Sequence, residues 1–183
     1  MATTKLMTSE DLWEIDDDFN QYELIRGELQ TVPPAGGDHG ALNSEVGRRI
    51  GNHVFEHKLG RVYQGETGFI LARNPDTILV PDIAFVRSDR MIRTPDHRGF
   101  LEQAPDLVVE VLSPSQSFRE AQRKMQTYID LGVRMGLLVH PYRQTISVYR
   151  PGRDPVVLGR DDIFDGEDVL PGFRVTVADL FIV

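Results

Sequence analysis

Two carboxylates interrupt apolar runs in which strands are expected. Glu110 lies within LVVEVL (107–112), and Asp82 lies within LVPDIAFV (79–86). A bare ionised carboxylate is costly in a sheet interior. Taken singly, each acid is explained by a strand end where it is solvated or paired with arginine, and Pro81 favours an edge, bulge or strand start near Asp82. Taken as a pair, the two acids indicate a divalent cation between them, and such oxygen ligands favour Mg²⁺ or Mn²⁺.

A lysine on the segment that follows Glu110 can meet these acids. Ser117 and Glu120 form a capping box, which predicts a helix from about Ser117. The apolar stripe of this helix consists of Phe118, Ala121, Met125, Tyr128 and Ile129. Lys124 falls at the margin of the stripe, and because helical side chains lean toward the N-terminus, it can reach back toward Glu110. A marginal lysine alone is usually a snorkelling surface residue. Beside two acids it becomes a candidate for stabilising a phosphate or a nucleophile.

The remaining pattern predicts the elements that position these residues. In the first half of the chain, they are a short helix over 8–18 capped by Thr8, two strands within 22–32 that turn at Arg26 and Gly27, and an amphipathic helix over 41–59. Strand segments follow at 61–64, 68–71 and 78–86, and then a loop over 90–99. The last elements are strands at 135–140 and 145–150 with a turn at 141–144, and a turn-rich tail over 151–183. Early hairpins followed by a crossover helix predict an α/β fold, a mixed β-sheet flanked by helices, in one domain over residues 1–183.

Composition narrows the classes of function. The chain has no cysteine, which excludes a disulfide framework, a thiolate metal site and a cysteine nucleophile. No apolar run approaches the roughly 20 residues of a membrane helix. The N-terminus is acidic and lacks an apolar core, so we expect a cytoplasmic protein with no membrane partner. The net charge of −8 argues against broad non-specific binding to nucleic acid, but not against a local site where bound metal changes the sign.

The chain resembles the PD-(D/E)XK nuclease superfamily, and within it the Uma-two family of bacterial endonucleases. The resemblance spans almost the whole chain and is carried by the order and spacing of YELIRGEL, GGDHG, GETGFIL, VPDIAFV, APDLVVEVLSPS, KMQTYIDLGVRMGLLVHP, ISVYRPG and DVLPGFRVTVADLF. It implies a restriction-endonuclease-like core in which Asp82 and Glu110, with the Val111 carbonyl as a further ligand, bind Mg²⁺ or Mn²⁺ for phosphodiester hydrolysis. The implied substrate is nucleic acid, with DNA as the first expectation.

The chain departs from the superfamily pattern at the lysine. That residue usually lies two positions after the acid, where this sequence has Leu112. The resemblance implies that the following helix supplies it instead, as Lys124. Glu28 and His39 also match recurring family positions, Glu28 as a third acid near the metal and His39 as a residue of the site wall. The alternatives are that Glu28 is a solvated strand residue and that His39 only helps to open a helix.

Other functions stay open. Leu112 and the acidic charge favour a non-catalytic binding module with a nuclease fold. HVFEH (53–57) matches an inverted zinc-peptidase motif. His53 and His57 nevertheless fall on the apolar side of their predicted helix, which favours packing. A homodimer is a further hypothesis, because cleavage of a duplex needs two sites.

Overall fold

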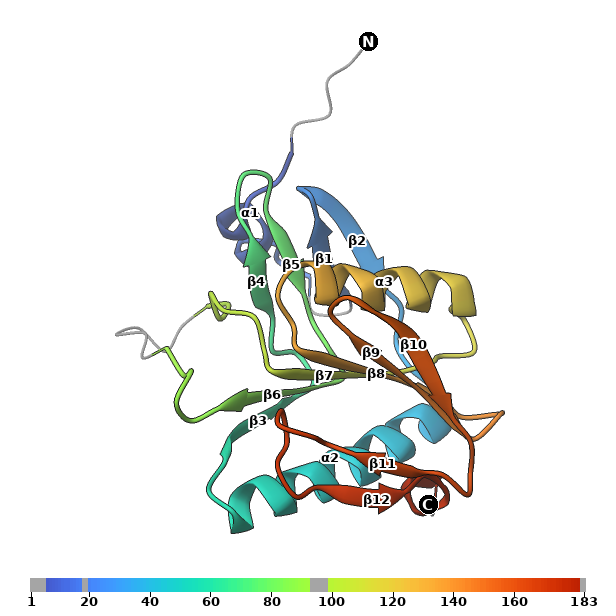
Figure 1. Ribbon diagram of the computed structural model, residues 1–183. Helices are drawn as coiled ribbons and strands as arrows, with labels where there is room; N and C mark the ends of the chain where they lie inside the picture. Colours follow the sequence, from blue (N-terminus) through green and yellow to red (C-terminus); the bar gives the residue numbers. More distant parts are fainter. Residues whose placement is uncertain (1–5, 18–19, 93–98, 182–183) are drawn as a thin grey trace.

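The computed structural model describes residues 6–17, 20–92 and 99–181. Within these ranges the chain forms a six-stranded and a four-stranded sheet, a small hairpin, and helices that cover them (Figure 1). The helices are α1 (Ser9–Trp13), α2 (Gly37–Glu56), α3 (Phe118–Asp130) and the 3₁₀ helix η1 (Val177–Phe181). The strands are β1 (Gln21–Ile25), β2 (Glu28–Val32), β3 (Gly60–Gln64), β4 (Phe69–Ala72), β5 (Thr77–Leu79), β6 (Ile83–Arg87), β7 (Leu107–Val111), β8 (Met135–His140), β9 (Thr145–Arg150), β10 (Arg153–Leu158), β11 (Ile163–Asp165) and β12 (Arg174–Thr176).

The six-stranded sheet is mixed. Its order is β10-β9-β8-β7-β6-β3, with β7 and β8 parallel and its other neighbouring strands antiparallel. Parallel neighbours need a crossover connection, and α3 is that connection between β7 and β8. The predicted fold class, a mixed sheet flanked by helices, is confirmed. Within the described ranges, no helix is both long and apolar enough to cross a bilayer.

Strand β7 sends its side chains to two different helices. Val109 and Val111 pack in the cluster that contains the apolar face of α2, whereas Val108 and Leu112 pack in the cluster that contains α3. This is the alternation expected along a strand. Figure 1 accordingly shows α2 and α3 on opposite faces of the sheet, with the β11–β12 hairpin on the α2 side. Glu110 has the parity of Val108 and therefore faces α3.

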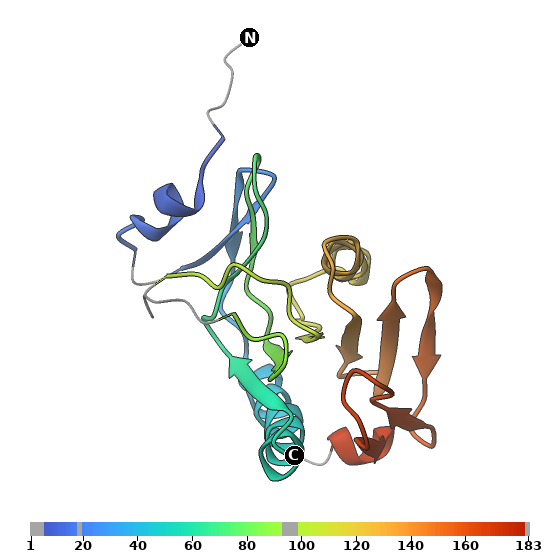
Figure 2. The same cartoon turned by 60° about the vertical axis from the view of Figure 1, so that its left-hand side comes forward.

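The four-stranded sheet, of order β2-β1-β5-β4, also lies against α3. On one side, Leu24 and Ile78 pack with α1. On the other side, Leu79 and Ile25 join the cluster built on α3. Figure 2 shows α3 end-on between the two sets of strands. Polar side chains from both sheets can therefore meet on one helix.

The predicted helices are confirmed, but two of them have shifted boundaries. Capping boxes at Thr8 and at Ser117 open α1 and α3. Helix α2 spans Gly37–Glu56 instead of 41–59, because the polar first turn adds residues that carry no apolar periodicity. Helix α1 ends at Trp13 instead of residue 18, which lies outside the described residues.

The predicted continuous strand at 78–86 is wrong. Strand β5 ends at Leu79 and belongs to the four-stranded sheet, whereas β6 begins at Ile83 in the six-stranded sheet. Pro81 lies between them, and a proline has no N–H to donate to a ladder. Asp82 therefore precedes a strand instead of lying inside one. Of the predicted loop over 90–99, residues 93–98 lie outside the described residues.

Candidate active site

Asp82 and Glu110 meet at the end of β7. Strands β6 and β7 pair antiparallel with Ile83 opposite Val109, so one further step of this register places Asp82 opposite Glu110. The backbone N–H of Val111 donates to Asp82 Oδ2 at 2.7 Å, which fixes this acid against β7. The structure therefore brings together the two acids that the sequence predicts to act as a pair.

Lys124 lies between two carboxylates. Its Nζ is 2.9 Å from Glu110 Oε1 and 2.9 Å from Glu23 Oε1. The Tyr128 hydroxyl, one turn further along α3, donates to Glu110 Oε1 at 2.8 Å. The backbone N–H of Val80 donates to Glu23 Oε1 at 2.7 Å. The lysine that leans back from α3 thus joins an acid of each sheet.

Burial and charge shift the pKa values of this cluster. Burial alone would lower the pKa of Lys124, but the adjacent carboxylates of Glu110 and Glu23 outweigh it and hold that pKa well above its usual value. Burial raises the pKa of Glu110 to about 7; the Lys124 charge opposes this rise, and the charges of Asp82 and Glu23 add to it. Glu110 and Glu23 share the Lys124 ammonium, and Asp82 adds a third negative charge near Glu110, so the ionised cluster is short of positive charge when His39 is neutral.

His39 forms a wall of the same site. It lies in the first turn of α2, is only 8% exposed, and its Nε2 is 2.9 Å from the Val111 carbonyl oxygen and 3.3 Å from Asp82 Oδ2. A carbonyl only accepts, so Nε2 carries a proton. The hydrogen bond with Asp82 raises the pKa of His39, although burial opposes this. The structure thus places His39 beside Asp82 and Val111, and its role as a residue of the site wall stays a prediction.

The third acid in contact with the cluster is Glu23, which the sequence analysis missed, and not Glu28. Glu28 begins β2, is exposed and pairs across the hairpin with Ile25. Among the described residues, the structure shows no contact between Glu28 and the pair of acids or Lys124. Glu23 is 4% exposed. The sequence does contain a pattern that could have identified Glu23, because this glutamate interrupts the apolar residues Tyr22, Leu24 and Ile25 just as Glu110 interrupts a run of valines.

The donor atoms fit a hard divalent cation. In the part of the chain that the structure describes, no group of three or more histidine, aspartate and glutamate side chains is arranged to hold a metal. Asp82 and Glu110 provide carboxylate oxygens, and the Val111 carbonyl has a second lone pair beside its hydrogen bond with His39. Mg²⁺ commonly uses one or two carboxylates and keeps several waters, whereas zinc prefers a closed set of N and S ligands.

The histidines of the peptidase-like motif pack against the chain instead. His53 Nε2 is 2.9 Å from the Pro171 carbonyl oxygen, and His57 Nδ1 is 2.9 Å from the His53 carbonyl oxygen. Their rings stack with centroids 4.2 Å apart. These contacts and the absence of a third ligand among the described side chains give the motif a structural explanation.

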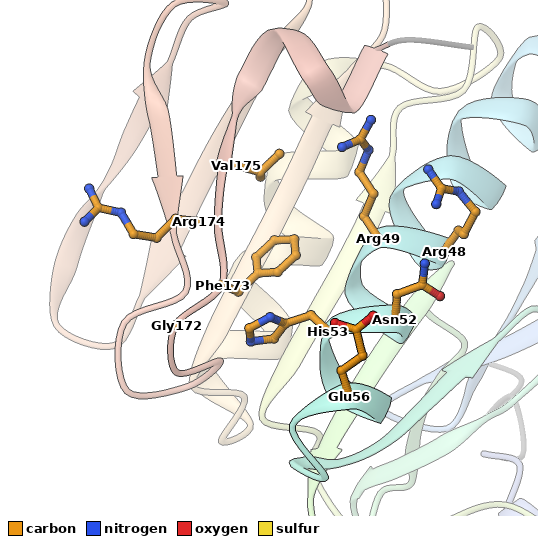
Figure 3. A pocket seen from close by; sticks show the side chains of 9 residues that line it. All are labelled: Arg48, Arg49, Asn52, His53, Glu56, Gly172, Phe173, Arg174 and Val175. Carbon is orange, nitrogen blue, oxygen red and sulfur yellow. The ribbon is translucent and has the colours of Figure 1, made fainter.

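A pocket of about 280 Å³ lies around His53, toward the C-terminal end of α2 and away from His39 (Figure 3). Two of the arginines that line it, Arg48 and Arg49, donate to the same Glu45 carboxylate. A third, Arg174, lies 3.4 Å from Asp165. Glu45 and Asp165 thus offset two of the three positive charges, and Glu56 also lines the pocket.

Comparison with known proteins agrees with a nuclease-like α/β class. The family model Uma2, described as "Putative restriction endonuclease", matches residues 10–178, and the chain belongs to this family. Among the solved structures that match, a crystal structure of "a putative nuclease belonging to DUF820" from Anabaena variabilis has 26% sequence identity and a TM-score of 0.83. The alignment covers 96% of this chain and 97% of that one. No functionally curated protein matches. The resemblance drawn from the sequence motifs is confirmed.

Proposed function

We propose that this protein hydrolyses phosphodiester bonds of nucleic acid, DNA first of all, with Mg²⁺ or Mn²⁺ held by Asp82, Glu110 and the Val111 carbonyl. The observation that carries the proposal is the Lys124 ammonium, 2.9 Å from Glu110. It supplies from α3 the charge that the superfamily usually places two residues after the acid, where Leu112 stands here. The family and the solved relative named above support the class of reaction.

Each polar group of the cluster has a role in this reaction. When bound, the divalent cation supplies polarisation of a phosphoryl oxygen and a lowered pKa for a coordinated water. The Lys124 ammonium stabilises the negative charge that develops on the phosphoryl oxygens. Its proton is retained at neutral pH because the carboxylates of Glu110 and Glu23 hold its pKa high. Lys124 therefore acts as a fixed positive charge and not as a general base.

Other side chains position these groups. The Tyr128 hydroxyl holds one oxygen of Glu110, and Glu23 holds the lysine from the opposite sheet. His39 lies against Asp82 and the Val111 carbonyl. A preorganised arrangement of this kind avoids reorganisation of charge during the reaction.

A cleavage assay with matched variants tests the proposal. Supercoiled DNA, linear duplex, single-stranded DNA and RNA are incubated with EDTA, Mg²⁺ or Mn²⁺. We expect cleavage only with metal, and its loss in Asp82→Asn with the fold preserved by circular dichroism. Glu56→Gln, an exposed acid of α2, is the control and should cleave normally. Cleavage that persists in EDTA would contradict the metal requirement.

The alternative, a non-catalytic module with this fold, makes the opposite prediction. It is favoured by the pairing of Lys124 with Glu110 and Glu23, since buried ion pairs of this kind can serve the fold alone. Under this alternative Asp82→Asn changes only stability, and no substrate is cleaved under any condition. The homodimer expected for duplex cleavage stays a prediction, which analytical ultracentrifugation tests.

A further inference from the structure

An apolar pocket adjoins the candidate active site. Its volume is about 390 Å³, within the range of small-molecule sites. His39 and Leu112 line it, and because His39 Nε2 lies 3.3 Å from Asp82 Oδ2, the pocket borders the site at Asp82 and Glu110. The full lining consists of Gly36, Gly37, Asp38, His39, Leu42, Leu112, Pro114, Pro141, Tyr142, Gln144 and Phe181.

The chemistry of this pocket disfavours a phosphate. Among the described residues that line it there is no lysine or arginine, and Asp38 adds a negative charge. Leu112, Pro114 and Phe181 make most of the wall apolar. The occupant that fits is therefore uncharged and largely apolar, with polar atoms at its edge for Asp38 and the Gln144 amide.

Tyr142 offers an exposed ring at the pocket. It lies in the turn between β8 and β9 and is 71% exposed. Its ring makes an edge contact with His140, with centroids 6.4 Å apart and planes at 81°. A flat group in the pocket can stack on such a ring, as nucleobases do on aromatic side chains.

We propose that this pocket holds one unstacked nucleobase of the nucleotide next to the scissile phosphate. The inference rests on the proposed function, and it names the substrate class as nucleic acid that is single-stranded or unpaired at the cut. A base within a duplex is stacked and paired, and entering a pocket requires its release. Leu112, which also packs in the cluster built on α3, is then a wall of the base pocket.

A binding experiment tests the pocket without cleavage. Single-stranded DNA and RNA oligonucleotides of one sequence carry 2-aminopurine at each position in turn, and the wild-type protein is added in EDTA at low salt. We expect stacking to change the fluorescence at one position. We expect Tyr142→Ala to abolish the change and weaken binding about tenfold, as loss of one stacked base does. Tyr142→Phe should retain both.

Phe55→Ala is the matched control, because Phe55 is an 85% exposed aromatic residue on α2 outside the pocket. It should bind as wild type does. A fluorescence change that survives Tyr142→Ala, or equal losses in Tyr142→Ala and Phe55→Ala, would overturn the proposal.

Cleavage of abasic substrates gives a second readout. When the base at one position beside the cut is removed from a single-stranded substrate, the wild-type protein should cleave that substrate about tenfold more slowly. Tyr142→Ala should then add no further loss on that substrate. Equal cleavage of every abasic substrate would contradict the pocket. A protein that cleaves nothing would contradict the proposed function alone, since the fluorescence readout still decides the pocket.

Discussion

Two buried carboxylates only four residues apart, Asp106 and Glu110, are compensated in opposite ways. Asp106 precedes β7 and is fully buried. It accepts from the guanidinium groups of Arg90 at 2.6 Å and Arg134 at 3.2 Å, and from the Arg87 backbone N–H at 2.9 Å. Glu110, in contrast, shares one ammonium with a second carboxylate.

The difference separates a structural acid from a candidate catalytic one. Two cations and a backbone donor surround Asp106, so burial of its charge is balanced within the protein. Around Glu110, the described side chains include three carboxylates, one lysine that two of them share, and His39, which adds a second positive charge only when it is protonated. A deficit of this kind is balanced when a divalent cation binds, so the comparison predicts which acid is needed for activity and which for stability.

The largest effect is expected for Glu110→Gln. Loss of the carboxylate removes a proposed metal ligand and should lower kcat/KM for cleavage at least about 10³-fold. The free energy of unfolding should not fall, because the substitution removes one of three crowded negative charges. Urea unfolding and initial rates check both parts, and a variant as active as the wild type would contradict the assignment.

The second largest effect on cleavage is expected for Lys124→Met. We expect cleavage to fall about 10²-fold because the transition state loses a fixed positive charge. The free energy of unfolding should drop by about 3 kcal/mol, since two buried carboxylates lose their partner. The double variant Lys124→Met/Glu110→Gln should recover part of this stability in urea unfolding. A double variant no more stable than Lys124→Met would show that charge is not the cause.

Asp106→Asn should reverse the pattern of Glu110→Gln. We expect the free energy of unfolding to fall by about 2 to 3 kcal/mol, because Arg90 and Arg134 lose a buried partner. Cleavage by the folded protein at low temperature should stay within about twofold, since no substrate contact is removed. Strong loss of kcat without loss of stability would erase the contrast between the two acids.

The two acids of the β1–β2 hairpin sharpen the same contrast. Glu23→Gln should slow cleavage about tenfold, because the lysine loses one charged hydrogen-bond partner. Glu28→Gln should leave the rate within about twofold, because exposed substitutions away from a site have small effects. Single-turnover rates measure both. A larger loss for Glu28→Gln would restore Glu28 as the third acid.

The smallest effect concerns Asp76, another buried carboxylate. Burial would raise its pKa, but hydrogen bonds from the Ser9 and Asn74 N–H groups and the Arg73 charge hold that pKa below its usual value. A depressed pKa contributes stability above the unfolded-state pKa of about 3.8, and this stability is lost as pH falls through the lower native pKa.

Asp76→Asn should therefore lower the free energy of unfolding by about 1 kcal/mol at pH 7, and by less at pH values below 3.8. Urea unfolding at several pH values measures the difference. A difference that stays constant through this acidic range would show that the ionised form is not what stabilises the fold.

Much of the fold and the core of the site could be predicted from local rules. The capping box at Ser117 and the stripe of α3 placed Lys124 toward Glu110, because helix geometry fixes where a side chain points. Strand alternation puts Glu110 on the face of Val108, and the structure places that face against α3.

The rest depended on contacts that are distant in sequence. Glu23 reaches Lys124 only because the four-stranded sheet packs on α3, and no periodicity encodes which strand faces which helix. The break at Pro81 was visible as a residue but not as a change of sheet. The base pocket joins the first turn of α2 to the β8–β9 turn, which the sequence places far apart.

Calorimetric titration with Mn²⁺ tests the central claim most directly. The wild type should bind the ion at a single site, and Asp82→Asn and Glu110→Gln should each lose that binding while Asp106→Asn keeps it. Absence of Mn²⁺ binding by the wild type, or equal binding by Glu110→Gln, would contradict the account.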